Sequence, residues 1–128
     1  MNIINKGNLN TPYIKLDLSN GNLTIIGKSY PEEPSVIYNP ILMDIKGQAE
    51  YLKDTNVTIK IALEIMNSIS TKYIFQIIKS LYELCSKIFV RWYCESDDDS
   101  MIEEGNNFKS SFPHSDFNII CVKDLRKI

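Results

Sequence analysis

The apolar residues of this chain recur with two periods, and segments of the two kinds alternate along it. In residues 57–66 every second side chain is apolar, which is the pattern of a strand with one buried face. Four other segments combine apolar runs with β-branched and aromatic residues and also predict strands. The five predicted strands are residues 13–18, 23–28, 57–66, 87–94 and 117–122. An Asn-Gly pair at residues 20–21 predicts a hairpin turn between the first two.

Apolar residues spaced three or four positions apart predict three helices between these strands. The first is expected from Pro40, with Asn39 as its N-cap, to about Lys53. The longest is expected over residues 70–86, and a short third helix within residues 96–110. The longest helix should bury one apolar stripe, formed by Ile74, Ile77, Ile78, Leu81, Leu84 and Cys85.

The predicted elements follow the order β-β-α-β-α-β-α-β, which is typical of an α/β fold. After the hairpin, strands alternate with helices, so right-handed crossovers should build a mixed, mostly parallel sheet. A chain of 128 residues is long enough for one hydrophobic core, and we expect a single-domain sandwich over residues 1–128. Residues 1–10 are expected to be a loosely ordered N-terminal segment.

Composition and charge narrow the possible functions only slightly. The net charge of −2 and the lack of a Lys/Arg cluster before the C-terminal tail argue against nucleic-acid binding. No apolar run approaches the ~20 residues that cross a bilayer, and the N-terminus lacks the apolar centre of a signal peptide. We therefore expect a cytoplasmic protein without membrane insertion. Cys85, Cys94 and Cys121 lie in apolar segments and are expected to be reduced core residues.

The sequence offers little support for catalysis or metal binding. It contains no nucleotide-binding glycine motif and no nucleophile elbow. His114 is the single histidine and is expected in a solvated loop. The acidic run at residues 95–104 suggests a calcium loop, but an EF-hand counted from Asp97 lacks the glycine at its sixth position and has Phe108 at its twelfth. We expect neither a metal ion nor a cofactor.

Helix capping explains the acidic run more simply. Asp98 or Asp99 is a suitable N-cap for the short helix that follows, and Ser100 with Glu103 matches a capping box. A remaining hypothesis is a small hydrolase or metal enzyme that combines this acidic run with His114.

The junction between the strand 57–66 and the longest helix has an unusual composition. It contains three hydroxyl side chains and a cation in the residues Asn67, Ser68, Ser70, Thr71 and Lys72. Helix starts favour Asp or Glu, whereas the next carboxylate here is Glu83. A phosphoryl group on Ser68 would carry about −1.5 to −2 charges and meet both the helix dipole and Lys72, one turn away. The alternative is a plain N-cap at Ser68 or Ser70 with a solvated lysine.

Six short motifs occur in an order and at a spacing that, taken together, are specific for one protein family, although each motif alone is weak evidence. They are TP (11–12), GKSYPE (27–32), YNP (38–40), NSISTK (67–72), RWYCESDDDSMIEEG (91–105) and FNII (117–120). Together they resemble the SiaC family of bacterial regulatory phosphoproteins over nearly the whole chain. The resemblance implies the STAS-like fold of anti-sigma-factor antagonists, a small α/β domain, in agreement with the order of elements above.

The resemblance also implies a function for the junction. In this family one hydroxyl at the start of the helix is phosphorylated by a dedicated Ser/Thr kinase and cleared by a PP2C-like phosphatase. The unmodified protein binds and activates a diguanylate cyclase, which raises cyclic di-GMP and favours biofilm formation. The family motif is similar to N-T-S-S-S-K, so Ser68 takes the place of the modified threonine, while Asn67 and Lys72 match. Ser70 or Thr71 is a secondary possibility.

The leading hypothesis is therefore a phosphoswitch that has no catalytic activity of its own. The alternative is an anti-sigma-factor antagonist that acts on another partner through the same junction. Candidate partner-binding residues outside the junction are Tyr30, Glu32, Asp98 and Asp99.

Overall fold

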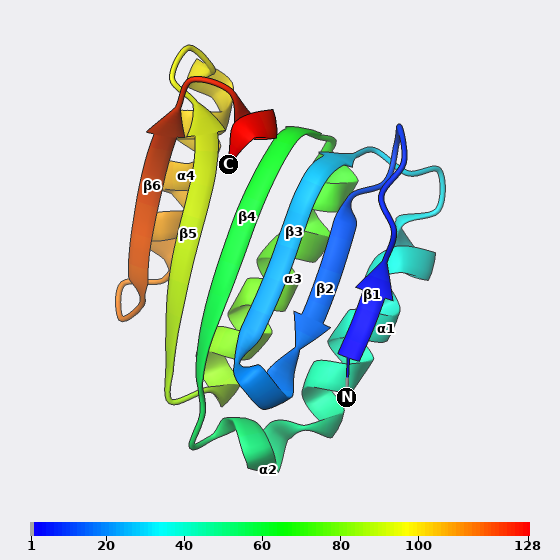
Figure 1. Ribbon diagram of the computed structural model, residues 1–128. Coiled ribbons are helices and arrows are strands. Elements are labelled where there is room, and N and C mark those ends of the chain that lie inside the picture. Colours follow the sequence, from blue (N-terminus) through cyan, green and yellow to red (C-terminus); the bar gives the residue numbers. More distant parts are fainter. Residues whose placement is uncertain (1) are drawn as a thin grey trace.

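The computed structural model describes residues 2–128 and contains one six-stranded sheet with four helices (Figure 1). Its strands are β1 (Asn2–Asn5), β2 (Tyr13–Asp17), β3 (Asn22–Ser29), β4 (Asn56–Met66), β5 (Lys87–Glu95) and β6 (Asp116–Val122). Its helices are α1 (Pro34–Gly47), α2 (Ala49–Leu52), α3 (Ser68–Leu84) and α4 (Asp99–Ser111), with short 3-10 turns at Leu18–Asn20 and Leu125–Lys127.

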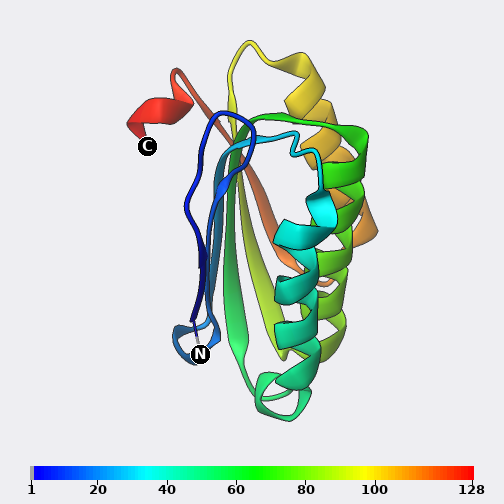
Figure 2. The ribbon, with the colours of Figure 1, turned by 90° about the vertical axis from the view of Figure 1, so that its right-hand side faces the viewer.

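The strands lie in the sheet in the order in which they occur in the chain. β1, β2 and β3 pair antiparallel, whereas β3, β4, β5 and β6 pair parallel. The helices lie on one face of the sheet, and the C-terminal 3-10 turn lies on the other (Figure 2). The prediction of an α/β fold with a mixed, mostly parallel sheet is confirmed. None of the helices in residues 2–128 is both long and apolar enough to span a bilayer.

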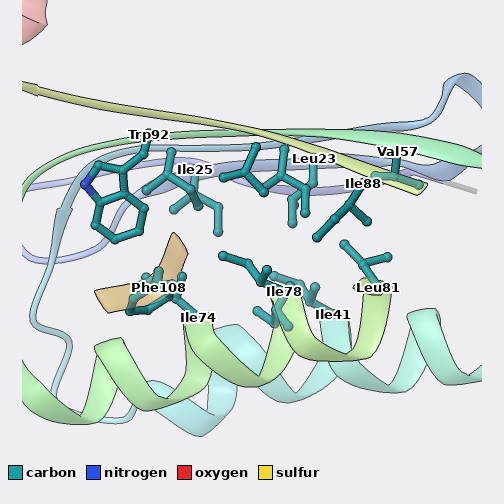
Figure 3. Close-up of a cluster of buried hydrophobic side chains, with 14 of the residues drawn as sticks. Leu23, Ile25, Ile41, Val57, Ile74, Ile78, Leu81, Ile88, Trp92 and Phe108 are labelled. Carbon is teal, nitrogen blue, oxygen red and sulfur yellow. The ribbon is translucent and has the colours of Figure 1, made fainter. Parts of the chain in front are cut away.

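The core lies between the sheet and its helices. Alternate strand residues face the helices, and α3 supplies its predicted stripe of buried isoleucines and Leu81 (Figure 3). Leu84 and Cys85, at the end of that stripe, are only half-buried. Among the cysteines, Cys94 is fully buried but Cys121 is exposed, which corrects the expectation that all three belong to the core. Strand β6 lies at the edge of the sheet, and this explains the exposure.

Helix α4 packs closely on the sheet through a glycine. A Cβ on Gly105 would lie 2.7 Å from Cδ1 and Nε1 of Trp92, so no larger residue fits in this arrangement. The indole Nε1 donates to the carbonyl of Met101 (3.1 Å), and the Phe108 ring lies 4.9 Å from the tryptophan ring. Trp92 thus fixes α4 against β5 both by packing and by a buried hydrogen bond.

The segment expected to be loosely ordered, residues 1–10, contains a strand in its described part, while Met1 lies outside the described residues. Residues 2–5 form β1, which pairs with β2 along its outer edge. Without β1, the backbone N–H and C=O groups of that edge would have no partner strand. The following loop is held by the side chain of Asn8, whose Oδ1 accepts hydrogen bonds from the backbone N–H groups of Asn10 and Thr11.

The first helix begins six residues earlier than expected, at Pro34 instead of Pro40. Both prolines suit a first helical turn, but Pro40 lies inside α1, where it lacks the N–H that would bond to the preceding turn. The additional turns carry Tyr38 into the core, where it is fully buried. Burial of this large side chain outweighs the single lost hydrogen bond.

The hairpin between β2 and β3 is confirmed, with its turn at residues 18–21, one residue earlier than expected. Leu18–Asn20 forms a 3-10 turn capped by Asp17, and Gly21 follows with φ 68°. A Cβ on Gly21 would lie 2.6 Å from the carbonyl oxygen of Asn56, so both conformation and space require glycine here.

Candidate functional site

The junction between β4 and α3 lies at the carboxyl edge of the parallel strands, beside the end of β3 (Figure 1). Asn67 is the N-cap of α3, since its side chain accepts from the backbone N–H of Ser70 (2.9 Å). Its carbonyl accepts from both the backbone N–H and the hydroxyl of Thr71, each at 2.9 Å. Its own N–H donates to the carbonyl of Ser29, the last residue of β3. The alternative in which Ser68 or Ser70 caps the helix is therefore wrong.

Ser68 is the first residue of α3, and its side chain is exposed. Its hydroxyl makes no hydrogen bond with any part of the chain that the structure describes. The first turn of α3 contains no acidic residue, so no side chain within it offsets the positive end of the helix dipole. Lys72, four residues on, is exposed on the same side of the helix.

Ser70, in contrast, belongs to a buried network of three hydroxyls from three elements. Its Oγ accepts from the hydroxyl of Ser29 (2.8 Å), which is itself bonded to the hydroxyl of Tyr38 (2.5 Å). All three side chains are 0% exposed, and the Tyr38 ring stacks on Tyr73 of α3. Burial raises the pKa of Tyr38, and the network therefore stays neutral at physiological pH. Of the three hydroxyl side chains in the first turn of α3, Ser68 alone is exposed.

The sequence analysis missed Ser29 and Tyr38. Ser29 ends a strand and Tyr38 lies within a helix, so each fits its element without an obvious role in the site. The available signal was the tyrosine itself, because a buried phenol requires a hydrogen-bond partner. Together these two residues tie α1 and β3 to the first turn of α3 and fix the position of the helix start.

Exposed apolar side chains occur close to Ser68 in the chain. Ile65, next to the end of β4, is 49% exposed, and Ile69, in the first turn of α3, is 51% exposed. Tyr30, 39% exposed, follows Ser29 directly and so lies next to Asn67. Glu32 is exposed on the loop between β3 and α1. The junction thus combines a free hydroxyl, a lysine and a small apolar surface.

The start of α4 lies next to this junction. Asp98 is the N-cap of α4 and accepts from the backbone N–H of Met101 (3.1 Å), so the predicted cap is confirmed. Because Asp98 is the cap, Ser100 and Glu103 do not form the expected capping box. An open pocket of about 330 Å³ separates the two helix starts, and both Thr71 and Asp98 line it. A neighbouring pocket of about 350 Å³, between α3 and α4, also includes Thr71 and is lined by Lys72.

The remaining candidate residues do not assemble into a catalytic centre. Asp99 is exposed in the first turn of α4 and lines neither of these pockets. His114 follows the other end of the same 13-residue helix, about 20 Å away, so it does not meet the acidic run. Within residues 2–128 no group of three or more His, Cys, Asp or Glu side chains is arranged to hold a metal ion.

Comparison with known proteins gives a consistent result. The model of the SiaC family of regulatory phosphoproteins matches residues 4–122. Among solved structures, SiaC of Pseudomonas aeruginosa shares 19% identity, with 97% of this chain and 99% of that chain covered and a TM-score of 0.77. Apo-SiaC from the same organism shares 20% identity, with coverage of 94% and 98% and a TM-score of 0.76.

A third solved structure contains a partner. It is the diguanylate cyclase SiaD of Pseudomonas aeruginosa in complex with its activator SiaC. This SiaC chain matches at 19% identity, with coverage of 97% and 99% and a TM-score of 0.76. At this level of identity the likeness shows a shared fold. No curated protein sequence matches the chain.

Proposed function

Because this chain belongs to the SiaC family of regulatory phosphoproteins, we propose that it is a phosphoswitch that activates a diguanylate cyclase. In the proposed mechanism the unmodified protein binds the cyclase through the surface around Ser68. Phosphorylation of Ser68 releases it. The protein itself performs no chemistry and acts through binding alone.

The observation that carries this proposal is the contrast in the first turn of α3. Ser68 has an exposed hydroxyl without a hydrogen bond among residues 2–128, whereas Ser70 is buried and Thr71 is bonded to the backbone. The helix is capped by Asn67, so modification of Ser68 removes no capping interaction. The free positive end of α3 and Lys72 both favour a phosphate at this position.

The apolar surroundings suggest how a phosphate would act on binding. If a partner covers Ile65 and Ile69 and offers no cation of its own, a phosphate on Ser68 becomes buried in the interface with only Lys72 to offset about −1.5 to −2 charges. Such an uncompensated charge costs on the order of 3–5 kcal/mol. At about 1.4 kcal/mol per tenfold change, this weakens affinity by roughly a hundred- to several-thousand-fold. The fold should survive, because the helix start itself accommodates an anion.

The proposal requires three partners in the cytoplasm. A diguanylate cyclase is the target, a Ser/Thr kinase adds the phosphate and a PP2C-like phosphatase removes it. Tyr30 and Asp98 adjoin the junction and are proposed to contact the target, and the exposed Glu32 and Asp99 are further candidates. Through the cyclase, the switch would control cyclic di-GMP and biofilm formation.

Three variants test the proposal against the diguanylate cyclase of the same host. Ser68→Asp should lose at least about a hundredfold in affinity by calorimetry, with a matching loss of cyclase activation, whereas Ser68→Ala should bind like the wild type. Ser86→Asp is the matched control, since it adds the same charge at an exposed position beyond the far end of α3. Equal binding by Ser68→Asp and Ser68→Ala would refute the switch. Phosphosite mapping on protein from the native host should find Ser68.

A further inference from the structure

Two cysteines lie side by side at the carboxyl edge of the sheet, on the strands β5 and β6 that flank α4 in the chain. Cys94 of β5 and Cys121 of β6 are direct partners in the parallel pairing of these strands. Side chains at paired positions of neighbouring strands project to the same face of a sheet. Neighbouring strands lie about 4.8 Å apart, inside the range of roughly 4.4–6.8 Å found between the Cα atoms of disulfides.

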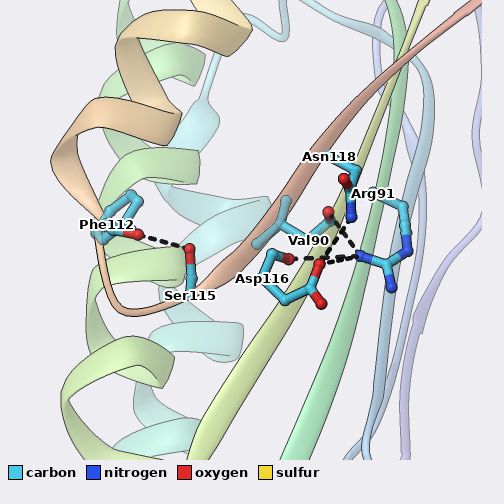
Figure 4. Close-up of polar contacts among 6 residues, drawn as sticks. All are labelled: Val90, Arg91, Phe112, Ser115, Asp116 and Asn118. Carbon is cyan, nitrogen blue, oxygen red and sulfur yellow. Dashed lines mark hydrogen bonds and ion pairs between the residues drawn. The ribbon is translucent and has the colours of Figure 1, made fainter.

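The pairing register of β5 and β6 places the two thiols side by side, and contacts before and after Cys121 in the chain stabilise this register. At the beginning of β6, Arg91 donates to the carboxylate of Asp116 (3.2 Å), as Figure 4 shows. At its end, the backbone N–H and the hydroxyl of Ser96 both donate to the carbonyl of Val122, at 2.9 and 3.1 Å. The edge strand therefore has little freedom to slip, and the two sulfur atoms stay neighbours.

The two thiols differ in their access to solvent. Cys121 is exposed, so a small oxidant can reach it, whereas Cys94 is fully buried. Burial and the adjacent Cys121 thiol raise the pKa of Cys94 to about 12. Cys94 is therefore almost entirely a protonated thiol at neutral pH, so Cys121 reacts first and Cys94 attacks later, through its small thiolate fraction.

We propose that Cys94 and Cys121 form a reversible disulfide when the protein meets a hydroperoxide. The Cys121 thiolate attacks one peroxide oxygen, which breaks the O–O bond, leaves Cys121 as a sulfenic acid and releases hydroxide, which takes up a proton to become the first water. The sulfur of Cys94 then attacks the sulfur of Cys121, so that the S–S bond forms as the S–O bond breaks. The oxygen leaves as water with the proton of Cys94. In total, two thiols and one hydrogen peroxide give one disulfide and two waters.

The disulfide would close a loop that contains the whole of α4. Residues 95–120, between the two cysteines, include the Asp98 cap and the turn into β6. The crosslink would fasten the edge strand to β5 and raise the melting temperature of the oxidised protein. It would form independently of Ser68 phosphorylation, so the failure of either proposal leaves the other standing.

The test is peroxide treatment of the reduced, full-length protein at low micromolar concentration, followed by blocking of free thiols and tryptic mapping. Trypsin cleaves after Lys109, which lies between the two cysteines, so a disulfide holds together the peptides 92–109 and 110–123. We expect this linked pair, an intact mass lower by two hydrogen atoms, and release of both peptides by dithiothreitol. Disulfide formation should become faster as pH rises, because the attack on the Cys121 sulfenic acid requires the Cys94 thiolate.

Two variants distinguish this pair from general thiol oxidation. Cys121→Ser should abolish the linked pair, and it replaces an exposed side chain, so the fold should be retained. Cys85→Ser should leave the pair unchanged, since Cys85 follows α3 at the opposite edge of the sheet. The proposal is overturned if Cys121 accumulates as sulfinic or sulfonic acid, forms dimers between chains, or stays unmodified while Cys94 remains free.

Discussion

Two helices start side by side at the carboxyl edge of this sheet, and their first turns carry opposite charge patterns. Helix α4 begins with a carboxylate at its cap, Asp98, and a second one in its first turn, Asp99. Helix α3 begins with the neutral cap Asn67 and has no acidic residue in its first turn. Both follow a parallel strand, so the difference comes from the side chains and not from the backbone.

The comparison shows two ways to treat the positive end of a helix. At α4 the dipole is offset permanently by two carboxylates. At α3 it is left open, and the exposed hydroxyl of Ser68 stands where a negative charge would be stabilised. The start of α3 also has two exposed apolar residues near it in the chain, Ile65 and Ile69. The start of α4 thus carries its own negative charge, whereas the start of α3 carries none.

The largest expected effect is a difference in folding stability between the same substitution at Ser70 and at Ser68, both in the first turn of α3. Ser70→Asp should destabilise the fold by about 3–5 kcal/mol, because it buries a carboxylate among groups that offer no cation. Ser68→Asp should not destabilise the fold, since its side chain is exposed to water. Urea unfolding of both variants measures the difference. If Ser70→Asp is as stable as Ser68→Asp, Ser70 is not buried in solution.

A smaller effect is expected from the two caps. Asn67→Ala and Asp98→Ala should each lower the free energy of unfolding by about 1 kcal/mol, because each leaves one backbone N–H of a first turn without its acceptor. The exchanges Asn67→Asp and Asp98→Asn should move stability in opposite directions, up at α3 and down at α4. A loss of stability in Asn67→Asp would contradict the expected gain from a negative charge at the start of α3.

The position of the α3 start could be predicted from the sequence because two clear periods meet there. Strand alternation runs to Met66, and helical spacing is established by Ile74, so the hydroxyl cluster could only lie between them. The same reasoning gave the order of the other main elements. It works where a segment is long and has one buried face, since burial then imposes the period.

Other features could not be predicted because they depend on distant or very short segments. Ser70 is buried against Ser29, 41 residues earlier in the chain, so its sequence neighbours give no sign of it. The start of α1 was misplaced because Pro34 and Pro40 suit a first turn equally well, and the burial of Tyr38 favours the earlier one. β1 is four residues long, too short to display a period.

The smallest prediction compares the same substitution at both helix starts. Ser68→Asp should stabilise the fold by about 0.3–1 kcal/mol, because it places a carboxylate in the unoccupied first turn of α3. Ser100→Asp, in the first turn of α4, should give no gain, since Asp98 and Asp99 already offset that dipole and repel a third charge. Urea unfolding at low salt should reveal the difference, and 1 M salt should remove most of it by screening. Ser68→Asn is the neutral control. An equal gain at both positions would show that the two starts do not differ electrostatically, and the open positive end of α3 would then offer a phosphate no special stabilisation.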